Sequence, residues 1–242
     1  YVDYDQPLSE EELEAMRRRI RRRLGGEPLA YIVGEKEFMS LPFYVSPAVL
    51  IPRPETEHLV EHTLSVLKER EACLVDVGTG SGVVAVSLAY YRPQWRIIAT
   101  DIDPAALAVA GRNAERHGVT DRITFHRGDL LSGLPAHRVD CILSNPPYIR
   151  EEELEGLSRE VKAQPRLALD GGRDGLKYYP ALIEGALSYL PLEGLLGLEV
   201  GKDQSEAVAT IMAGVGYGNI KGIEDYGGHK RCIFGYRKGD GR

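Results

Sequence analysis

A regular alternation of short apolar runs with helical stretches, beginning at residue 72, constrains the fold more than any other feature. Uninterrupted apolar strands that alternate with helices are typical of a parallel sheet covered by helices on both faces. The sequence therefore predicts an α/β fold. The expected strands cover residues 73–77, 96–100, 123–126, 139–143 and 195–200, and the expected helices cover residues 82–91, 104–117, 175–190 and 203–214.

The chain closes with two further strand-like runs, 219–224 and 231–236, which are joined by the short link Tyr226-Gly227-Gly228. A parallel crossover needs a dozen or more residues, so these two strands must be antiparallel to each other. Together with the five preceding runs they predict a mostly parallel, seven-stranded sheet with an antiparallel final hairpin.

The residues before the sheet predict a small extension. Residues 8–24 form an amphipathic helix in which Ser9 is the expected N-cap, and residues 37–51 form a short β-hairpin that leads into a loop. A helix over residues 55–69 then begins the main domain. We therefore divide the chain into an N-terminal helix (1–26), a hairpin linker (27–54) and a catalytic domain (55–242). The apolar stripe of the first helix consists of Leu13, Met16, Ile20 and Leu24.

The segment from Arg17 to Arg23 contains six arginines and resembles a nucleic-acid patch. Because the whole chain has a net charge of −6, binding that relies on phosphate neutralisation is not expected. We interpret the run as a solvated helix face paired with the glutamates upstream.

The chain contains neither a secretory signal nor an apolar run near the roughly 20 residues that span a bilayer. Cys73, Cys141 and Cys232 lie far apart in apolar segments, which favours buried free thiols in a reducing compartment. We therefore expect a cytoplasmic protein that does not bind a membrane, and we expect it to be a monomer.

The sequence His58-Leu59-Val60-Glu61-His62 fits the H-x-x-E-H pattern of one class of zinc peptidases. A catalytic zinc ion needs a third protein ligand, and the sequence offers no distal carboxylate for that purpose. We therefore predict no metal site.

Polar features fall where the predicted strands end, which is where ligands of such sheets bind. Asp76-Val77-Gly78-Thr79-Gly80-Ser81-Gly82 is a glycine-rich turn that lets a ligand approach the main chain, and Val83 replaces the third glycine of the dinucleotide pattern. Asp101 is placed to bind a ribose, and Asp129 to reach an adenine edge. These features describe an adenosine-shaped ligand, and their acidity fits the positive charges of S-adenosylmethionine.

Asn145-Pro146-Pro147-Tyr148 follows the fourth expected strand. Two prolines fix the backbone and remove two donors, which leaves carbonyl oxygens free to point at a ligand. Asn145 adds a side-chain acceptor, and Tyr148 can pack against a planar group. This array is suited to holding an –NH₂ group.

The glycine loop together with Asn145–Tyr148 resembles the class I, Rossmann-like methyltransferases that modify planar nitrogens. Three upstream segments narrow the resemblance to the HemK family, the glutamine methyltransferases of peptide chain release factors. They are Tyr31-Ile32-Val33-Gly34, Phe38 to Phe43, and Leu50-Ile51-Pro52-Arg53-Pro54-Glu55-Thr56-Glu57, and the resemblance continues through Gln164-Pro165-Arg166 and Gly171-Gly172.

This resemblance implies methylation of the glutamine in the Gly-Gly-Gln motif of a release factor. Asn145 and the carbonyl of Pro146 would accept the two amide protons of that glutamine and aim its nitrogen at the sulfonium methyl group. Pro147 and Tyr148 would complete the substrate site. Gly78, Thr79, Gly80, Ser81, Gly82, Asp101, Asp129, Leu130 and Asn145 would line the cofactor, and residues 53–57 would border the pocket.

Members of the family usually carry a helical N-terminal domain, of which residues 1–26 represent a remnant; that domain is either missing from this sequence or reduced. Two other substrates remain open. A glutamine methyltransferase of a ribosomal protein would share every motif. A DNA amino-methyltransferase would need a target-recognition region and a basic cleft, which this acidic chain does not offer.

Overall fold

Seven strands form the central sheet of the computed structural model, which describes residues 7–134 and 138–239. The strand order is β5-β4-β3-β6-β7-β9-β8, and all neighbours up to β7 are parallel, whereas β9 pairs antiparallel with both β7 and β8. The predicted mostly parallel sheet with an antiparallel final hairpin is confirmed. Its strands are β3 (Cys73–Val77), β4 (Arg96–Asp101), β5 (Ile123–Arg127), β6 (Cys141–Ser144), β7 (Leu195–Glu199), β8 (Tyr217–Glu224) and β9 (Lys230–Arg237).

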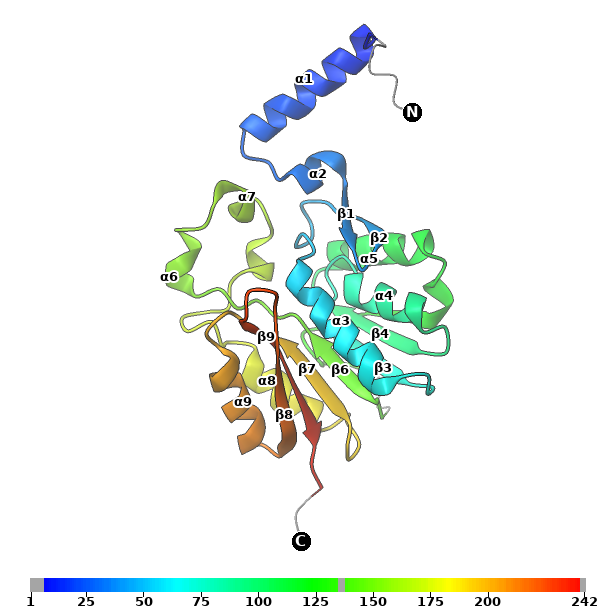
Figure 1. Ribbon diagram of the computed structural model, residues 1–242, viewed down its shortest axis with the longest axis vertical. Coiled ribbons are helices and arrows are strands. Elements are labelled where there is room, and N and C mark those ends of the chain that lie inside the picture. The colour runs from blue at the N-terminus through cyan, green and yellow to red at the C-terminus, as the bar shows by residue number, and fades with distance from the viewer. Residues whose placement is uncertain (1–6, 135–137, 240–242) are drawn as a thin grey trace.

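Helices cover both faces of this sheet (Figure 1). Successive strand residues point to opposite faces, so Leu74 joins the core beneath one set of helices and Val75 joins the core beneath the other. Both layers are apolar, which explains why the strands read as continuous hydrophobic runs. One face carries α3 (Pro54–Leu67), α4 (Val83–Tyr91) and α5 (Pro104–Arg116), and the other carries α8 (Tyr179–Ala186) and α9 (Ser205–Gly214).

The loops contain short helices that the sequence did not predict, and one predicted helix is shorter than expected. Instead of spanning 175–190, α8 begins at Tyr179, because Gly175 has a φ of 76° and Pro180 fits only the first turn of a helix. The short helices are α2 (Leu29–Val33), α6 (Glu151–Leu154), α7 (Arg159–Lys162), and the 3₁₀ turns η1 (Thr120–Arg122) and η2 (Arg166–Ala168).

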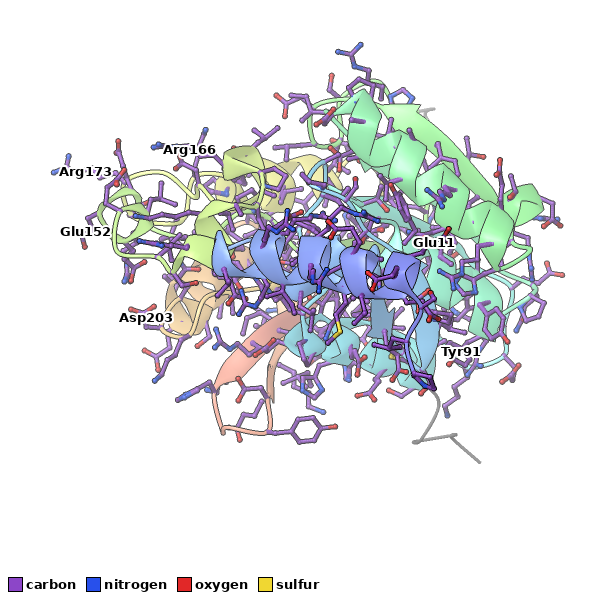
Figure 2. All side chains as sticks on the ribbon, turned by 90° about the horizontal axis from the view of Figure 1, so that it is seen from above. Glu11, Tyr91, Glu152, Arg166, Arg173 and Asp203 are labelled. Atoms are coloured by element: carbon purple, nitrogen blue, oxygen red, sulfur yellow. The ribbon has the colours of Figure 1, made fainter. Side chains whose placement is uncertain are left out.

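Before the sheet, α1 (Glu10–Leu24) projects away from the rest of the chain, and β1 (Glu35–Phe38) pairs with β2 (Leu41–Tyr44) as the predicted hairpin (Figure 1). Ser9 caps α1 through a capping box, as predicted. The predicted apolar stripe does not face a core, since no residue of α1 is buried and Leu24 is 78% exposed. In the view from above, α1 lies across the middle of the molecule, in front of the other elements (Figure 2).

The arginines of α1 are exposed and partly paired with glutamates, as the sequence indicated. Arg17, Arg18 and Arg21 lie 3.4–4.0 Å from the carboxylate of Glu14. Exposed pairs of this kind contribute little to stability, about 0–1 kcal/mol each. None of the helices in the described part of the chain is long and apolar enough to cross a membrane.

Candidate active site

A cavity of about 390 Å³ lies at the carboxyl ends of the parallel strands β3, β4, β5 and β6. This is the position expected for ligands of an open α/β sheet, and the volume falls in the usual range of small-molecule sites. Most of the residues predicted for the cofactor and substrate lie on its wall. They are Gly78, Thr79, Gly80, Ser81, Asp101, Asp129, Leu130, Asn145, Pro146 and Pro147.

The glycine loop connects β3 to α4 and forms one side of the cavity. Its central amide belongs to Gly80, which donates a hydrogen bond of 2.9 Å to the Oδ2 atom of Asp101. Gly82 has a different role, because it does not line the cavity. Its φ is 81°, and a Cβ atom there would stand 2.9 Å from the Cβ of Ala110. Gly82 therefore allows α4 to begin sharply and to pack closely on α5.

Four aspartates line this cavity, Asp76, Asp101, Asp103 and Asp129. None of them has an ion-pair partner within 4.0 Å among the described residues, although Arg53 and Lys177 also line the wall. Burial raises the pKa of Asp76 to about 6, against hydrogen bonds from Thr79 and the amide of Ala85 that lower it. An acidic, partly desolvated wall suits a cationic ligand, which would stabilise the ionised carboxylates. The residues present therefore fit S-adenosylmethionine, which is positively charged at sulfur and at its amino group.

Asn145 lies directly after β6 and is held by a hydrogen-bond chain that the sequence did not predict. Its Nδ2 atom donates a 3.1 Å hydrogen bond to Oγ1 of Thr56, and that hydroxyl donates a 2.6 Å hydrogen bond to Oε2 of Glu199. Among the described residues no group donates to Oδ1 of Asn145. The amide oxygen is therefore available on the cavity wall as a hydrogen-bond acceptor.

Tyr148 does not line the cavity. Its ring packs against the core beneath α8 and α9, and its hydroxyl lies 3.5 Å from Oε1 of Glu199, at the upper limit for a hydrogen bond. Burial, the largest cause, raises the pKa of this phenol well above its usual value. The predicted contact between Tyr148 and a planar substrate thus stays a prediction.

The loop after β6 is supported from behind by residues 169–171. The amide of Ile149 donates to the carbonyl of Leu169 (3.0 Å), and the amide of Gly171 donates to the carbonyl of Ile149 (2.8 Å). The two backbones approach so closely that a Cβ atom on Gly171 would stand 2.7 Å from the Cα of Tyr148. Only glycine fits this position without displacing the loop.

Residues 53–57 border the cavity only in part, through Arg53 and Thr56. Glu57 instead accepts a 2.7 Å hydrogen bond from the amide of Met39 and so fixes the hairpin. Pro165, Leu167 and Ala168, further along the chain, also line the cavity. The charged side chains of Arg166, Arg173 and Glu152 lie at one edge of the molecule (Figure 2).

Glu199 received no role from the sequence, whereas Thr56 and Asp76 were predicted only as members of the pocket border 53–57 and of the glycine-rich turn 76–82. Glu199 had a usable signal, since it is the last residue of an apolar strand, as is Asp101. Thr56 had none, because a threonine in the first turn of a helix is ordinary. Its partners are 143 and 89 positions away in sequence.

The two histidines of the zinc-like pattern pack against aromatic rings. The ring of His58 lies 5.3 Å from that of Tyr226, and the ring of His62 lies 4.3 Å from that of Phe234. Within the described ranges, no group of three or more His, Cys, Asp or Glu side chains is arranged to hold a metal ion.

Glu199 is only 1% exposed, and burial, the largest cause, raises its pKa from 4.5 to about 7. The folded protein therefore holds this proton more tightly than the unfolded chain does, so the free energy of unfolding falls as the pH rises from about 4.5 to about 7. Glutamine has no proton to lose. As the pH rises through this window, we therefore expect the free energy of unfolding of Glu199→Gln to increase relative to that of the wild type, by an amount on the order of 1–3 kcal/mol.

Urea unfolding of both proteins at several pH values between about 4 and 8 checks this prediction. Asp76, whose pKa is raised to about 6, is present in both proteins, so its contribution cancels in the difference between their free energies of unfolding. A difference between the two free energies that stays constant with pH would show that Glu199 does not titrate in this range.

Comparison with known proteins agrees with this geometry. The model of the Methyltransferase small domain family matches residues 56–172, and that of the PrmC N-terminal domain matches residues 1–34. Curated relatives named "Release factor glutamine methyltransferase" include that of Moorella thermoacetica, 49% identical over 90% of this chain and 78% of the relative. The relative from Geobacter sulfurreducens is 43% identical over 97% of this chain and 82% of the relative. The relative from Escherichia coli K12 is 39% identical over 94% of this chain and 82% of the relative.

Solved structures share the fold at low sequence identity. A methyltransferase from Pyrococcus furiosus has a TM-score of 0.63 at 19% identity, covering 91% of this chain and 98% of that one. The Thermus thermophilus 16S rRNA N2 G1207 methyltransferase, solved with AdoMet and guanosine, has a TM-score of 0.62 at 15% identity, covering 84% and 50%. The fold is that of the class I methyltransferases. Because relatives at 39–49% identity align over most of both chains, this protein belongs to the release factor glutamine methyltransferase family.

Proposed function

We propose that the protein transfers a methyl group from S-adenosylmethionine to the side-chain amide nitrogen of the glutamine in the Gly-Gly-Gln motif of a peptide chain release factor. The observation that carries this proposal is the orientation of Asn145 on the cavity wall. Asn145 lines the cavity, and its –NH₂ group is engaged by Thr56, which leaves its oxygen available as an acceptor. An acceptor is what the –NH₂ group of a substrate amide requires.

The cofactor would lie along the glycine loop. The backbone of Gly78–Ser81 would allow the cofactor to approach closely. The carboxylates of Asp101 and Asp129 would accept hydrogen bonds from its hydroxyl and amino groups, and Leu130 would make an apolar contact. When bound, S-adenosylmethionine supplies a methyl group on a positively charged sulfur, which leaves as a neutral thioether with the electron pair of the broken bond.

The substrate amide would lie beside the loop after β6. An amide nitrogen is a poor nucleophile because its lone pair is delocalised into the carbonyl group. Oδ1 of Asn145 and the carbonyl oxygen of Pro146 would accept hydrogen bonds from the two N–H groups of the substrate amide. These bonds would orient the nitrogen and place the partial negative charges of the two oxygens next to the N–H groups. The chain thereby contributes positioning and electrostatic stabilisation, and one proton passes to water after transfer.

The names of the relatives support the release factor as substrate, and the acidic cavity supports the cofactor. Labelled S-adenosylmethionine offered with a release factor, with ribosomal proteins and with DNA tests the proposal. We expect label on the release factor, and none when its Gly-Gly-Gln glutamine is replaced by alanine. Label on the ribosomal proteins alone, or on DNA alone, would overturn the proposed substrate.

A further inference from the structure

Glu199 is a buried carboxylate linked to two residues of the loop after β6. It contacts Tyr148 directly, and it is linked to Asn145 through Thr56. Its Oε2 atom accepts the hydrogen bond from Thr56, and its Oε1 atom faces the hydroxyl of Tyr148. Glu199 does not line the cavity, so its carboxylate is not placed to bind the cofactor. Burying such a group is costly unless it is hydrogen-bonded, and Thr56 and Tyr148 are the partners of this carboxylate.

The frame around Glu199 fixes the position of this carboxylate. Ser144 pairs with Leu198 in the parallel ladder of β6 and β7, so the next residues along the two strands, Asn145 and Glu199, are neighbours at the edge of the sheet. The carbonyl of Glu199 accepts a 2.9 Å hydrogen bond from the hydroxyl of Tyr179. Thr56 enters from the first turn of α3 and lines the cavity beside Asn145.

The chemistry of the three groups determines which end of the Asn145 amide faces the cavity. An asparagine side chain has nearly the same shape when its oxygen and nitrogen are exchanged, so shape alone does not select one orientation. The hydroxyl of Thr56 has a single proton, and Glu199 accepts it. The lone pairs of that hydroxyl can only accept, so the hydroxyl oxygen binds the –NH₂ end of Asn145.

We propose that Glu199, acting through the hydroxyl of Thr56, is a positioning residue that holds the Asn145 amide with its oxygen toward the substrate. This inference rests on the proposed methylation of an amide. If the chain is broken, Thr56 or water can donate to Oδ1 of Asn145, and the amide can present its –NH₂ group to the –NH₂ group of the substrate. Two donors facing each other do not bind.

The direct test removes the hydroxyl and keeps the shape. Thr56→Val is expected to lower kcat about 10- to 100-fold, while the Kd for S-adenosylmethionine changes less than about threefold. Thr56→Ser restores a hydroxyl and should recover most of the lost rate. Thr63→Val is the matched control, because Thr63 is a buried threonine two turns further along α3 whose hydroxyl binds only the carbonyl of Leu59. We expect Thr63→Val to retain the wild-type kcat.

Glu199→Met tests the other end of the chain with an unbranched apolar side chain. We expect a loss of kcat similar to that of Thr56→Val. The double variant should lose no more than either single variant, because each breaks the same chain. Should Thr56→Val fail to fold by circular dichroism, Thr56→Ala and Glu199→Met provide the same comparison.

The outcomes separate this inference from the proposed function. Wild-type protein that methylates no release factor would contradict the proposed function. Active wild-type protein whose Thr56→Val and Glu199→Met variants both retain the wild-type kcat would overturn the positioning role. Losses that multiply in the double variant, or that appear equally in Thr63→Val, would overturn it as well, since they indicate independent structural damage.

Discussion

Replacing Asn145 with alanine is expected to lower kcat for methylation of the release factor about 100- to 1,000-fold, the range seen when one preorganised hydrogen-bonding group is removed from an active site. The variant loses the acceptor on the cavity wall, so the substrate amide keeps one unpaired proton and its nitrogen is free to rotate. The carbonyl oxygen of Pro146 remains in place. Some activity above background should therefore persist.

Binding of S-adenosylmethionine is the internal control for this variant. The glycine loop and the acids at Asp101 and Asp129 are untouched, so the Kd measured by calorimetry should stay within a few-fold of the wild-type value. Single-turnover kinetics measured beside that Kd separate chemistry from binding. A variant that turns over at nearly the wild-type rate would show that Asn145 does not hold the reacting amide.

The second large effect is expected at Gly171, which never contacts the cavity. Gly171→Ala would place a methyl group 2.7 Å from the backbone of Tyr148 and 2.9 Å from the carbonyl oxygen of Pro147. Backbone atoms have no rotamer in which to retreat, so the loop after β6 must move. Because a misplacement of about 1 Å can cost about 100-fold in rate, we expect kcat to fall at least about 10-fold.

Gly111→Ala is the matched control for this substitution. Gly111 lies within α5, and a Cβ atom there meets nothing within 4 Å, so alanine should leave kcat unchanged and stabilise the helix by roughly 0.5–1 kcal/mol. Gly171→Ala should also lower the thermal midpoint, since overpacking typically costs about 1–3 kcal/mol. Wild-type kcat in Gly171→Ala would mean that residues 169–171 do not support the loop.

The sequence predicted most of the sheet because burial on both faces leaves a readable pattern. Leu74 and Val75 lie on opposite faces yet are both buried, so their strand is uniformly apolar. Local chemistry also predicted the cap of α1 correctly, since the hydroxyl of Ser9 accepts a hydrogen bond from the amide of Glu12, three residues away. Structural features that depend on residues close together in the sequence could thus be predicted without a structure.

Long-range partners were not accessible in the same way. The link from Glu199 through Thr56 to Asn145 joins three separate elements, and only the order of β6 and β7 in the sheet brings them together. The exposure of Leu24 on α1 could not be predicted for a similar reason, because an amphipathic pattern shows that a face is apolar without showing what covers it. The boundaries drawn at residues 26 and 54 and the monomeric state remain predictions.

The central claim is that the methyl group reaches the amide nitrogen of one glutamine. Tandem mass spectrometry of a release factor incubated with the wild-type protein and S-adenosylmethionine tests it most directly. We expect a single methyl group on the side chain of the glutamine in Gly-Gly-Gln, and an unmodified peptide when Asn145→Ala replaces the wild-type protein for the same short time. A methyl group on any other residue of the release factor would contradict it.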